Sequence, residues 1–346
     1  MWSMADDGST TAARRATMRD VADRAGVSKS LVSLAFSSPA SVSPERRARI
    51  LDAADALGFR PNRVARSLNG ARDDFVGILV ADSRNPVLAE VVDAARVSLA
   101  AGGRLGLMTS AVLPNGSSRP RLDLDAVAML GDLQPSGLIV VGSVPTMDRV
   151  VQVMGAARIV IASARPGRLA GAATVRGDDE VGIRLVVDHL VDIGHRRIGH
   201  VGGAGGRVAT GRAEAFRAAV HEHGLDGALD GGLVAESDFS EAAGYRAALE
   251  LLDRDEPPTA ITAVNDLAAI GVTAAVRQRG LSGSVAVTGY DNTYLAALGA
   301  VDLTSVDPDN AAIGRRAAEL LLSEENPGEV LIAPTLRVRS SSVPRD

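Results

Sequence analysis

Apolar residues near the start of the chain recur with the period of a short helix. Between residues 18 and 25 they stand at i, i+3, i+4 and i+7, so they share one side of that helix. They are Met18, Val21, Ala22 and Ala25. Thr17 can cap the first turn together with Asp20, three residues on, and Gly26 can end the helix in the left-handed conformation.

A second short helix is expected directly after this turn, with Ser28 as its cap. Its inward-facing residues are Leu31, Val32 and Ala35. The residues near its solvent-facing start are Lys29, Ser30 and Ser33. Two short helices joined by a tight turn form a helix-turn-helix, whose second helix can lie in the major groove of DNA. Two ordinary surface helices joined by a glycine turn are the alternative reading of this stretch.

A third helix is expected between residues 43 and 58. It starts with Ser43-Pro44-Glu45, which supplies a cap, a proline at the first helical position and an acid in the first turn. Its apolar stripe consists of Ile50, Ala54 and Leu57. Residues 1–16, by contrast, are polar and show no periodicity, so we expect a disordered arm there.

The pattern changes at Phe75, where the segment FVGILVA is a continuous β-branched run typical of a strand buried in a parallel sheet. Runs of this kind then alternate with amphipathic helices. The expected helices span residues 87–101, 122–133, 147–155, 179–193, 210–223, 240–252, 266–279 and 310–322. Two such arrays in series predict an α/β body of two Rossmann-like parallel sheets, which form two lobes facing across a cleft.

Several short segments stand in a fixed order between Thr17 and Leu68. They are Asp20-Val21-Ala22, Ala25-Gly26-Val27-Ser28, Val32-Ser33, Val42-Ser43-Pro44-Glu45, Gly58-Phe59-Arg60-Pro61-Asn62 and Ala65-Arg66-Ser67-Leu68. In this order they resemble the headpiece of the LacI/GalR family of bacterial transcriptional repressors. The resemblance implies a DNA-binding headpiece at residues 17–58, and a hinge helix and linker at residues 59–73. In the family the hinge helix inserts a leucine into the minor groove, and Leu68 matches that leucine.

The body has its own landmarks, spread between residues 85 and 304. They are Asn85-Pro86, Asp178, His189-Leu190, Gly194-His195, Asn265-Asp266, Gly289-Tyr290-Asp291 and Leu303-Thr304. With these, residues 74–346 resemble the periplasmic-binding-protein-like effector domain of the same family. The resemblance implies crossings between the lobes near residues 194, 307 and 333. The implied ranges are about 74–193 and 307–333 for lobe 1, and about 194–306 and 334–346 for lobe 2.

The DNA-binding residues that we expect lie on the helix-turn-helix and on the hinge. They are Thr17, Ser28, Lys29, Ser30, Ser33, Leu34, Asn62, Arg63, Ala65, Arg66 and Leu68. Lys29 and Ser30 are the best candidates for direct readout of bases. Many relatives carry arginine where Leu34 stands. A leucine cannot donate a hydrogen bond, so it contacts a thymine methyl group or simply packs.

Four residues of the second lobe match the family's effector-binding pattern, and the ends of parallel strands are where ligands bind. They are Arg212 in Arg-x-x-Ala-Phe, Phe239, Asn265 and Asp291 in Gly-Tyr-Asp. Polar groups for hydroxyl pairs and one aromatic face are what a sugar or nucleoside site requires. The alternatives are a surface salt bridge for Arg212, a core packing role for Phe239 and a helix N-cap for Asp291.

The first lobe would contribute Asn85, Val87 and Leu88 to the same site. Many relatives have aromatic residues after this Asn-Pro. The aliphatic side chains here leave more room and remove a stacking face, which argues against a purine. We therefore expect a carbohydrate as effector and no cofactor or metal. An effector that releases the operator and one that tightens the grip on it both fit the sequence.

Composition and charge agree with a DNA-binding regulator. The chain has 346 residues, no cysteine and a net charge of −5. Twelve basic and five acidic residues between Arg14 and Arg72 give this segment a charge of +7, which leaves −12 for the remainder. A basic module is attracted to phosphates while an acidic body is repelled from them. Without an apolar run near the start or one of membrane-spanning length, we expect a cytoplasmic protein that does not contact a membrane.

Two other functions share parts of this pattern. A solute-binding protein of a transport system has the same two-lobed fold, but the headpiece argues against it. An enzyme on a Rossmann-like body would need a catalytic constellation, and none stands out. Gly202–Gly206 is better explained as a turn than as a phosphate loop. His221 and His223 point apart on a helix, which disfavours a metal site.

No leucine heptads follow Arg339, so we expect a homodimer on a pseudo-palindromic operator.

Overall fold

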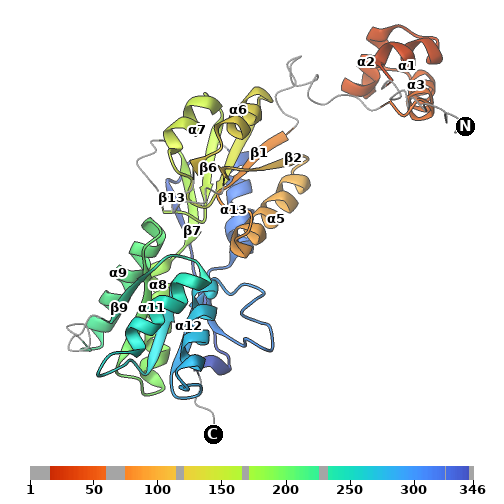
Figure 1. Cartoon of the computed structure of the whole chain (residues 1–346). Coiled ribbons are helices and arrows are strands. Elements are labelled where there is room, and N and C mark those ends of the chain that lie inside the picture. The colour runs from red at the N-terminus through yellow and green to blue at the C-terminus, as the bar shows by residue number, and fades with distance from the viewer. Residues whose placement is uncertain are drawn as a thin grey trace, which may run out of the picture. The chain divides into compact units, whose positions relative to one another are not determined.

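The structure, a computed structural model, describes residues 16–59, 75–113, 121–165, 171–225, 233–323 and 325–342. The chain divides into two compact units, residues 1–70 and residues 71–346 (Figure 1). The arm expected at residues 1–16 lies outside the described residues except for Ala16. The hinge and linker expected at residues 59–73 lie outside them except for Phe59.

Three helices and one turn make up the headpiece in the first unit: α1 (Met18–Ala25), α2 (Lys29–Ser37), a 3-10 turn (Pro39–Ser41) and α3 (Pro44–Ala56). The backbone N–H of Thr17 donates to Asp20 over 2.7 Å, and the N–H of Asp20 donates to the Thr17 hydroxyl, so the expected capping box is present. Gly26 ends α1 with φ +64°, and Ser28 caps α2 by accepting from the N–H of Leu31. The helix-turn-helix prediction is confirmed.

The headpiece core lies where these three helices meet. Its buried members are Val21, Ala22, Val32, Ala35, Val42, Ile50, Ala53, Ala54 and Phe59. Phe59 follows α3, and its ring centroid lies 5.9 Å from that of Phe36 on α2. One expected detail is wrong, because Ser43 occupies the N-cap position of α3 without a side-chain hydrogen bond.

Lobe 1 of the second unit is built on a six-stranded parallel sheet in the order β13-β7-β6-β5-β1-β2. Its strands are β1 (Phe75–Val80), β2 (Leu105–Ser110), β5 (Gly137–Val141), β6 (Arg158–Ala162), β7 (Ala173–Gly177) and β13 (Glu329–Ile332). Its helices are α5 (Pro86–Ala101), α6 (Leu124–Asp132), α7 (Met147–Met154) and α13 (Asn310–Leu322). A small antiparallel ribbon is formed by β3 (Val112–Leu113) and β4 (Arg121–Leu122).

Lobe 2 repeats this plan with the order β14-β12-β11-β10-β8-β9. Its strands are β8 (Ile198–Gly203), β9 (Val234–Ser237), β10 (Ala260–Ala263), β11 (Ala286–Tyr290), β12 (Thr304–Asp307) and β14 (Thr335–Arg337). Its helices are α8 (Asp179–Asp192), α9 (Arg207–Glu222), α11 (Glu241–Leu252) and α12 (Asp266–Gln278), and a 3-10 turn follows at Ser340–Ser342. All strand pairs are parallel except β12 with β14. The expected two-lobed α/β fold is confirmed.

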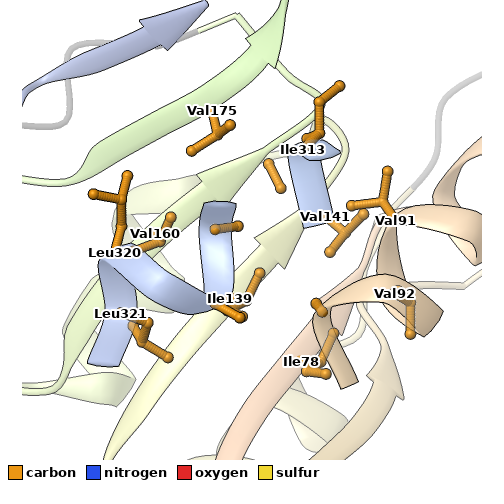
Figure 2. Packing of buried hydrophobic residues seen from close by; sticks show 14 of the residues in the cluster. Ile78, Val91, Val92, Ile139, Val141, Val160, Val175, Ile313, Leu320 and Leu321 are labelled. Carbon is orange, nitrogen blue, oxygen red and sulfur yellow. The ribbon is translucent and has the colours of Figure 1, made fainter. Parts of the chain in front are cut away.

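The inner strands of both sheets are buried on their two faces, which explains the continuous apolar runs in the sequence. In lobe 1, α5 and α13 cover one face and α6 and α7 the other. Figure 2 shows the first of these layers, where Ile313 and Leu321 of α13 pack with Ile78 and Ile139 of the sheet. Among the helices of the described residues, none combines the length and the apolar character required to cross a membrane.

The first crossing between the lobes lies earlier than expected. The resemblance placed it near residue 194, with the preceding helix in lobe 1. Instead the apolar side of α8, including Ile183 and Val187, is buried against Phe216 and Val306 of lobe 2. The chain therefore leaves lobe 1 directly after β7. It returns after β12 and crosses a last time between β13 and β14.

Glycines bring two helix pairs into backbone contact. An added Cβ at Gly314 of α13 would overlap the carbonyl oxygen of Val91 on α5. In lobe 2, a Cβ at Gly244 of α11 would overlap the Ala268 carbonyl, and one at Gly271 of α12 would overlap the Glu241 carbonyl. Backbone atoms cannot swing away as a side chain can, so these positions accept no side chain without a shift of the whole helix.

We predict that Gly271→Ala lowers the free energy of unfolding of the full-length protein by about 1–3 kcal/mol, the usual cost of overpacking. Urea titration followed by circular dichroism measures this change. Gly299→Ala is the matched control, because an added Cβ there meets no atom within 4 Å. Equal stability of the two variants would contradict the backbone contact between α11 and α12.

Candidate functional site

A cavity of about 570 Å³ lies between the two lobes. It is lined by six of the seven residues that the sequence singled out for effector binding, namely Asn85, Val87, Leu88, Arg212, Phe239 and Asp291. The seventh, Asn265, is buried behind the wall. Its side-chain amide donates to the Phe239 carbonyl over 3.2 Å, while its oxygen caps α12. Asn265 therefore holds the backbone of a lining residue rather than facing the cavity.

The lobe 1 side of this group is set by the start of α5. Asn85 is the N-cap, and its side chain accepts a hydrogen bond from the N–H of Val87 over 3.1 Å. Pro86 follows at the first helical position, where its missing N–H costs nothing. This start places Val87 and Leu88 in the first turn, and both side chains line the cavity.

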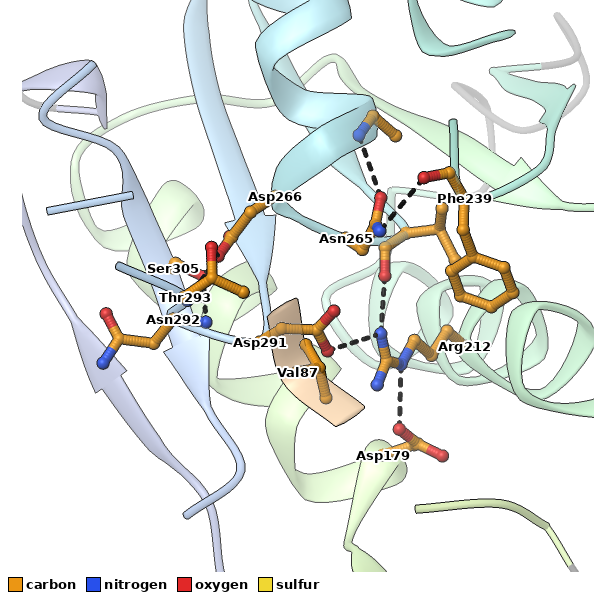
Figure 3. Close-up of polar contacts among 12 residues, drawn as sticks. Val87, Asp179, Arg212, Phe239, Asn265, Asp266, Asp291, Asn292, Thr293 and Ser305 are labelled. Atoms are coloured by element: carbon orange, nitrogen blue, oxygen red, sulfur yellow. Dashed lines mark hydrogen bonds and ion pairs between the residues drawn. The ribbon is translucent and has the colours of Figure 1, made fainter. Parts of the chain in front are cut away.

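Arg212 of α9 is the most strongly constrained side chain in the cavity wall (Figure 3). Its Nε donates to Asp179 over 2.9 Å, and its Nη1 donates to the Val264 carbonyl over 2.6 Å and to Asp291 over 3.3 Å. Its guanidinium carbon lies 3.5 Å from the centre of the Tyr290 ring. The residue is only 7% exposed, so a surface salt bridge is the wrong reading for it.

Charge and burial compete in this cluster. Burial alone would lower the pKa of Arg212, but the carboxylates of Asp179 and Asp291 outweigh it and raise that pKa. For Asp291 burial dominates and raises its pKa to about 7, although the charge of Arg212 acts against it. The N-cap alternative for Asp291 is wrong as well, because a turn rather than a helix follows it. Asp291 directly follows β11 and has φ +100°, and its N–H donates to the Val306 carbonyl.

Asp179 joins arginines from both lobes, and the sequence did not single it out. One of its oxygens accepts from Arg212 of lobe 2. The other accepts from Arg165 over 3.3 Å and from Arg176 over 3.5 Å, both of lobe 1. Asp179 is the first residue of α8, and Asp178 is the N-cap of that helix. The run Asp178-Asp179-Glu180 was the available signal, but it does not tell which acid turns inward.

Lobe 1 also contributes two acceptors that the sequence did not reveal. The Ser163 hydroxyl and the Asn310 carbonyl oxygen are buried, and neither makes a hydrogen bond within the described residues. Both residues line the cavity. The Asn310 amide donates to Glu90 over 2.9 Å and to the Asp291 carbonyl over 3.2 Å, so this side chain connects the two lobes. Its free oxygen is a ready partner for a donor on a ligand.

The apolar part of the wall is mostly aliphatic. Among the described residues it consists of Ala81, Val87, Leu88, Val112, Leu113, Ala164, Val208, Pro308, Ile313 and one aromatic ring, that of Phe239. Phe239 also packs against the core of lobe 2, so the core reading and the cavity reading both hold for it. An added Cβ at Gly205 would come within 3.3 Å of this ring. The glycine turn before α9 thus leaves room for the ring.

The headpiece presents its expected DNA-binding residues on the surface. Thr17, Ser28, Lys29, Ser30, Ser33 and Leu34 are all exposed. Thr17 and Ser28 also cap α1 and α2, so their hydroxyls are engaged within the headpiece. The expected hinge contacts Asn62, Arg63, Ala65, Arg66 and Leu68 lie outside the described residues.

The fold and the cavity together define a class of protein, in which a helix-turn-helix module is joined to a two-lobed ligand-binding domain. Two family models match the chain. The model for "Bacterial regulatory proteins, lacI family" matches residues 17–62, and that for "Periplasmic binding protein-like domain" matches residues 187–342. Both matches agree with the units seen in the structure.

Known proteins resemble the chain over nearly its whole length. It is 30% identical to the HTH-type transcriptional repressor PurR of Mannheimia succiniciproducens, over 88% of this chain and 91% of that protein. It is 27% identical to the transcriptional regulator CelR in its cellobiose complex, with a TM-score of 0.67 over 94% of this chain and 100% of that one. The Lac repressor dimer bound to operator and the anti-inducer ONPF shares the fold, with 24% identity, a TM-score of 0.75 and coverage of 95% and 100%.

The chain therefore belongs to the LacI family of bacterial transcriptional regulators. It is a DNA-binding transcriptional repressor with an effector-binding domain. The relatives are regulators rather than enzymes, which confirms the expectation that this chain is not an enzyme.

We predict that Asp291→Asn changes how stability depends on pH. The unfolded carboxyl ionises near its ordinary pKa of 3.8 and the folded one near 7, so the wild type loses stability as the pH rises between these values. As the pH rises, the free energy of unfolding of the wild type should therefore fall relative to that of the variant, by up to about 1.4 kcal/mol per pH unit. Above pH 8 the gap should stay constant.

Urea titrations of the full-length protein between pH 5 and pH 8 measure this gap. Asp253→Asn is the control, because a hydrogen bond from Arg279 lowers the pKa of Asp253, and its ionisation falls below this range. A flat gap for Asp291→Asn, like that expected for the control, would show that Asp291 is fully ionised beside Arg212 throughout.

Proposed function

We propose that this repressor binds a pseudo-palindromic operator as a homodimer, and that a carbohydrate bound between the lobes controls its affinity for the operator. The observation that carries the ligand part is the composition of the cavity wall. Charged groups of lobe 2, Arg212 and Asp291, share one cavity with the acceptors of lobe 1, Ser163 and Asn310. A ligand with hydroxyl groups on several sides can bind both lobes at once.

The shape of the apolar wall supports a sugar over a flat base. A sugar ring has one apolar face that stacks on an aromatic ring, and its hydroxyls pair with carboxylate, amide and guanidinium groups. Phe239 supplies one such face, and the aliphatic Val87 and Leu88 line the wall of lobe 1. A purine held between two aromatic faces would find only one here among the described residues. The cellobiose complex of the relative CelR agrees with a carbohydrate.

The ion pairs at Asp179 provide a route from the ligand to the lobes. Asp179 binds Arg165 and Arg176 of lobe 1 and Arg212 of lobe 2 at the cavity wall. A ligand that hydrogen-bonds to Arg212 or Asp179 changes the relative strengths of these ion pairs. It thereby changes the preferred orientation of one lobe relative to the other. Because coupling is reciprocal, operator binding must then change the affinity for the ligand by the same factor.

The proposed homodimer has a candidate surface on lobe 1. Strand β2 is an edge strand of its sheet, and it carries exposed apolar side chains at Leu105, Leu107 and Met108. An uncovered apolar sheet edge favours association with a partner. A twofold dimer would present two headpieces, which matches an operator made of two inverted half-sites. We further propose that Lys29, Ser30 and Ser33 contact bases, and that the hinge contacts the minor groove.

We predict that selection from a random duplex pool by the full-length protein enriches a palindrome with a flexible pyrimidine–purine step at its centre. Affinity for this operator, measured by anisotropy, should fall by about a thousandfold between 50 and 200 mM salt if six or more phosphates are contacted. Leu68→Ala should weaken binding about tenfold or more, because the wedge that holds the kink is lost. Ser67→Ala is the adjacent control. A single half-site as the enriched sequence would contradict the dimer.

We predict that a sugar, and not a purine, raises the melting temperature of the protein and changes its operator affinity. A panel containing cellobiose, ribose, adenine and guanine tests this by thermal shift and anisotropy. Phe239→Leu should weaken binding of the active sugar about two- to twelvefold, the range for the loss of an aromatic contact. Tyr245→Leu is the matched control, since Tyr245 of α11 does not line the cavity. Stabilisation by a purine alone would overturn the carbohydrate assignment.

A further inference from the structure

The solvent-facing side of α2 has a simple pattern. The first, second, fifth, sixth and ninth residues of this helix are exposed, which places them together on one side of it. They are Lys29, Ser30, Ser33, Leu34 and Ser37. Val32 and Ala35 on the opposite side are buried in the headpiece core. The exposed side thus holds one cation, three hydroxyls and one leucine, and the helix carries no acid.

Leu34 is the unusual member of this set. It is 38% exposed, and among the described residues of the headpiece it is the one large apolar side chain that stands so open to water. The other large apolar residues of α2, Leu31 and Phe36, pack against the headpiece core, and Leu34 does not. Packing within the headpiece therefore does not account for this leucine.

The chemistry of the major groove offers one apolar partner. Base edges there present hydrogen-bond donors and acceptors, and the C5 methyl group of thymine is the apolar exception. In a helix-turn-helix the second helix enters this groove. We propose that Leu34 contacts a thymine methyl group in each operator half-site. This proposal rests on the proposed operator binding and adds one base of the operator to it.

The arrangement of the neighbours fits such a contact. Ser30 lies four residues before Leu34 and Ser37 three residues after it, so both neighbour Leu34 on the helix surface. Their hydroxyls can donate to or accept from base edges next to the methyl group. The Leu34 side chain forms no hydrogen bonds, so the contact depends on the thymine methyl group rather than on the pairing edge of the base. Uracil, which differs from thymine only by this methyl group, is therefore the sharp probe.

The experiment uses the operator enriched by the full-length protein and replaces each thymine in turn by deoxyuridine. We expect one position per half-site at which uracil weakens binding about fourfold, the effect of losing one buried apolar group, and about fifteenfold when both half-sites are changed. Leu34→Ala should bind the thymine and uracil operators equally. Because Leu34 is exposed and outside the core, this variant should keep its helical circular dichroism signal.

Ser33→Ala is the matched control on the same side of the helix. It should bind with lower affinity but keep the difference between thymine and uracil. The proposal is overturned if uracil is tolerated at every position, or if Leu34→Ala still distinguishes the two bases. If no sequence is enriched at all, operator recognition and this contact fail together, whereas an enriched operator indifferent to uracil overturns this contact alone.

Discussion

Arg212 carries a positive charge in a place nearly closed to water, and such a charge is tolerated only where its protons are paired. The pairing groups come from three separate segments of lobe 2: Asp179 at the start of α8, Val264 after β10 and Asp291 after β11. They meet because parallel strands end at the same edge of a sheet and α8 packs against that sheet. Burial and the charges of Arg217 and Arg212 also lower the pKa of the neighbouring His200 to about 3, so no second cation forms beside Arg212.

The same cluster links the cavity wall to both lobes. Asp179 has two carboxylate oxygens, and it divides them between Arg212 of lobe 2 and two arginines of lobe 1. Asn310 repeats this arrangement on the other side, with its amide shared between Glu90 and the Asp291 carbonyl. Removing one partner of a buried ion pair costs several kcal/mol. A ligand that replaces such a partner therefore acts on groups to which both lobes are already sensitive.

What the sequence could predict follows from how far apart the interacting residues lie in the chain. The cap at Thr17, the glycine turn at Gly26 and the strand starting at Phe75 rest on near neighbours, so their patterns are local. The placement of α8 could not be read in this way, because the stripe of Ile183 and Val187 would fit either sheet. Asp179 and Asn310 became visible only once distant segments were brought together. Arg212 and Asp291 could be singled out because a family motif marks them.

The two faces that we assign to recognition share one physical property. Within the described residues, the headpiece uses the hydroxyls of Thr17 and Ser28 for its own helix caps, and it leaves Leu34 outside its core. The cavity wall likewise holds Arg212 in place through its Nε and Nη1, while the oxygens of Ser163 and Asn310 have no partner among the described residues. A group whose interactions are met inside the fold gains little from a ligand, because binding only exchanges one partner for another. Leu34, Ser163 and Asn310 are the groups that gain most, so specificity for operator and effector should be concentrated there.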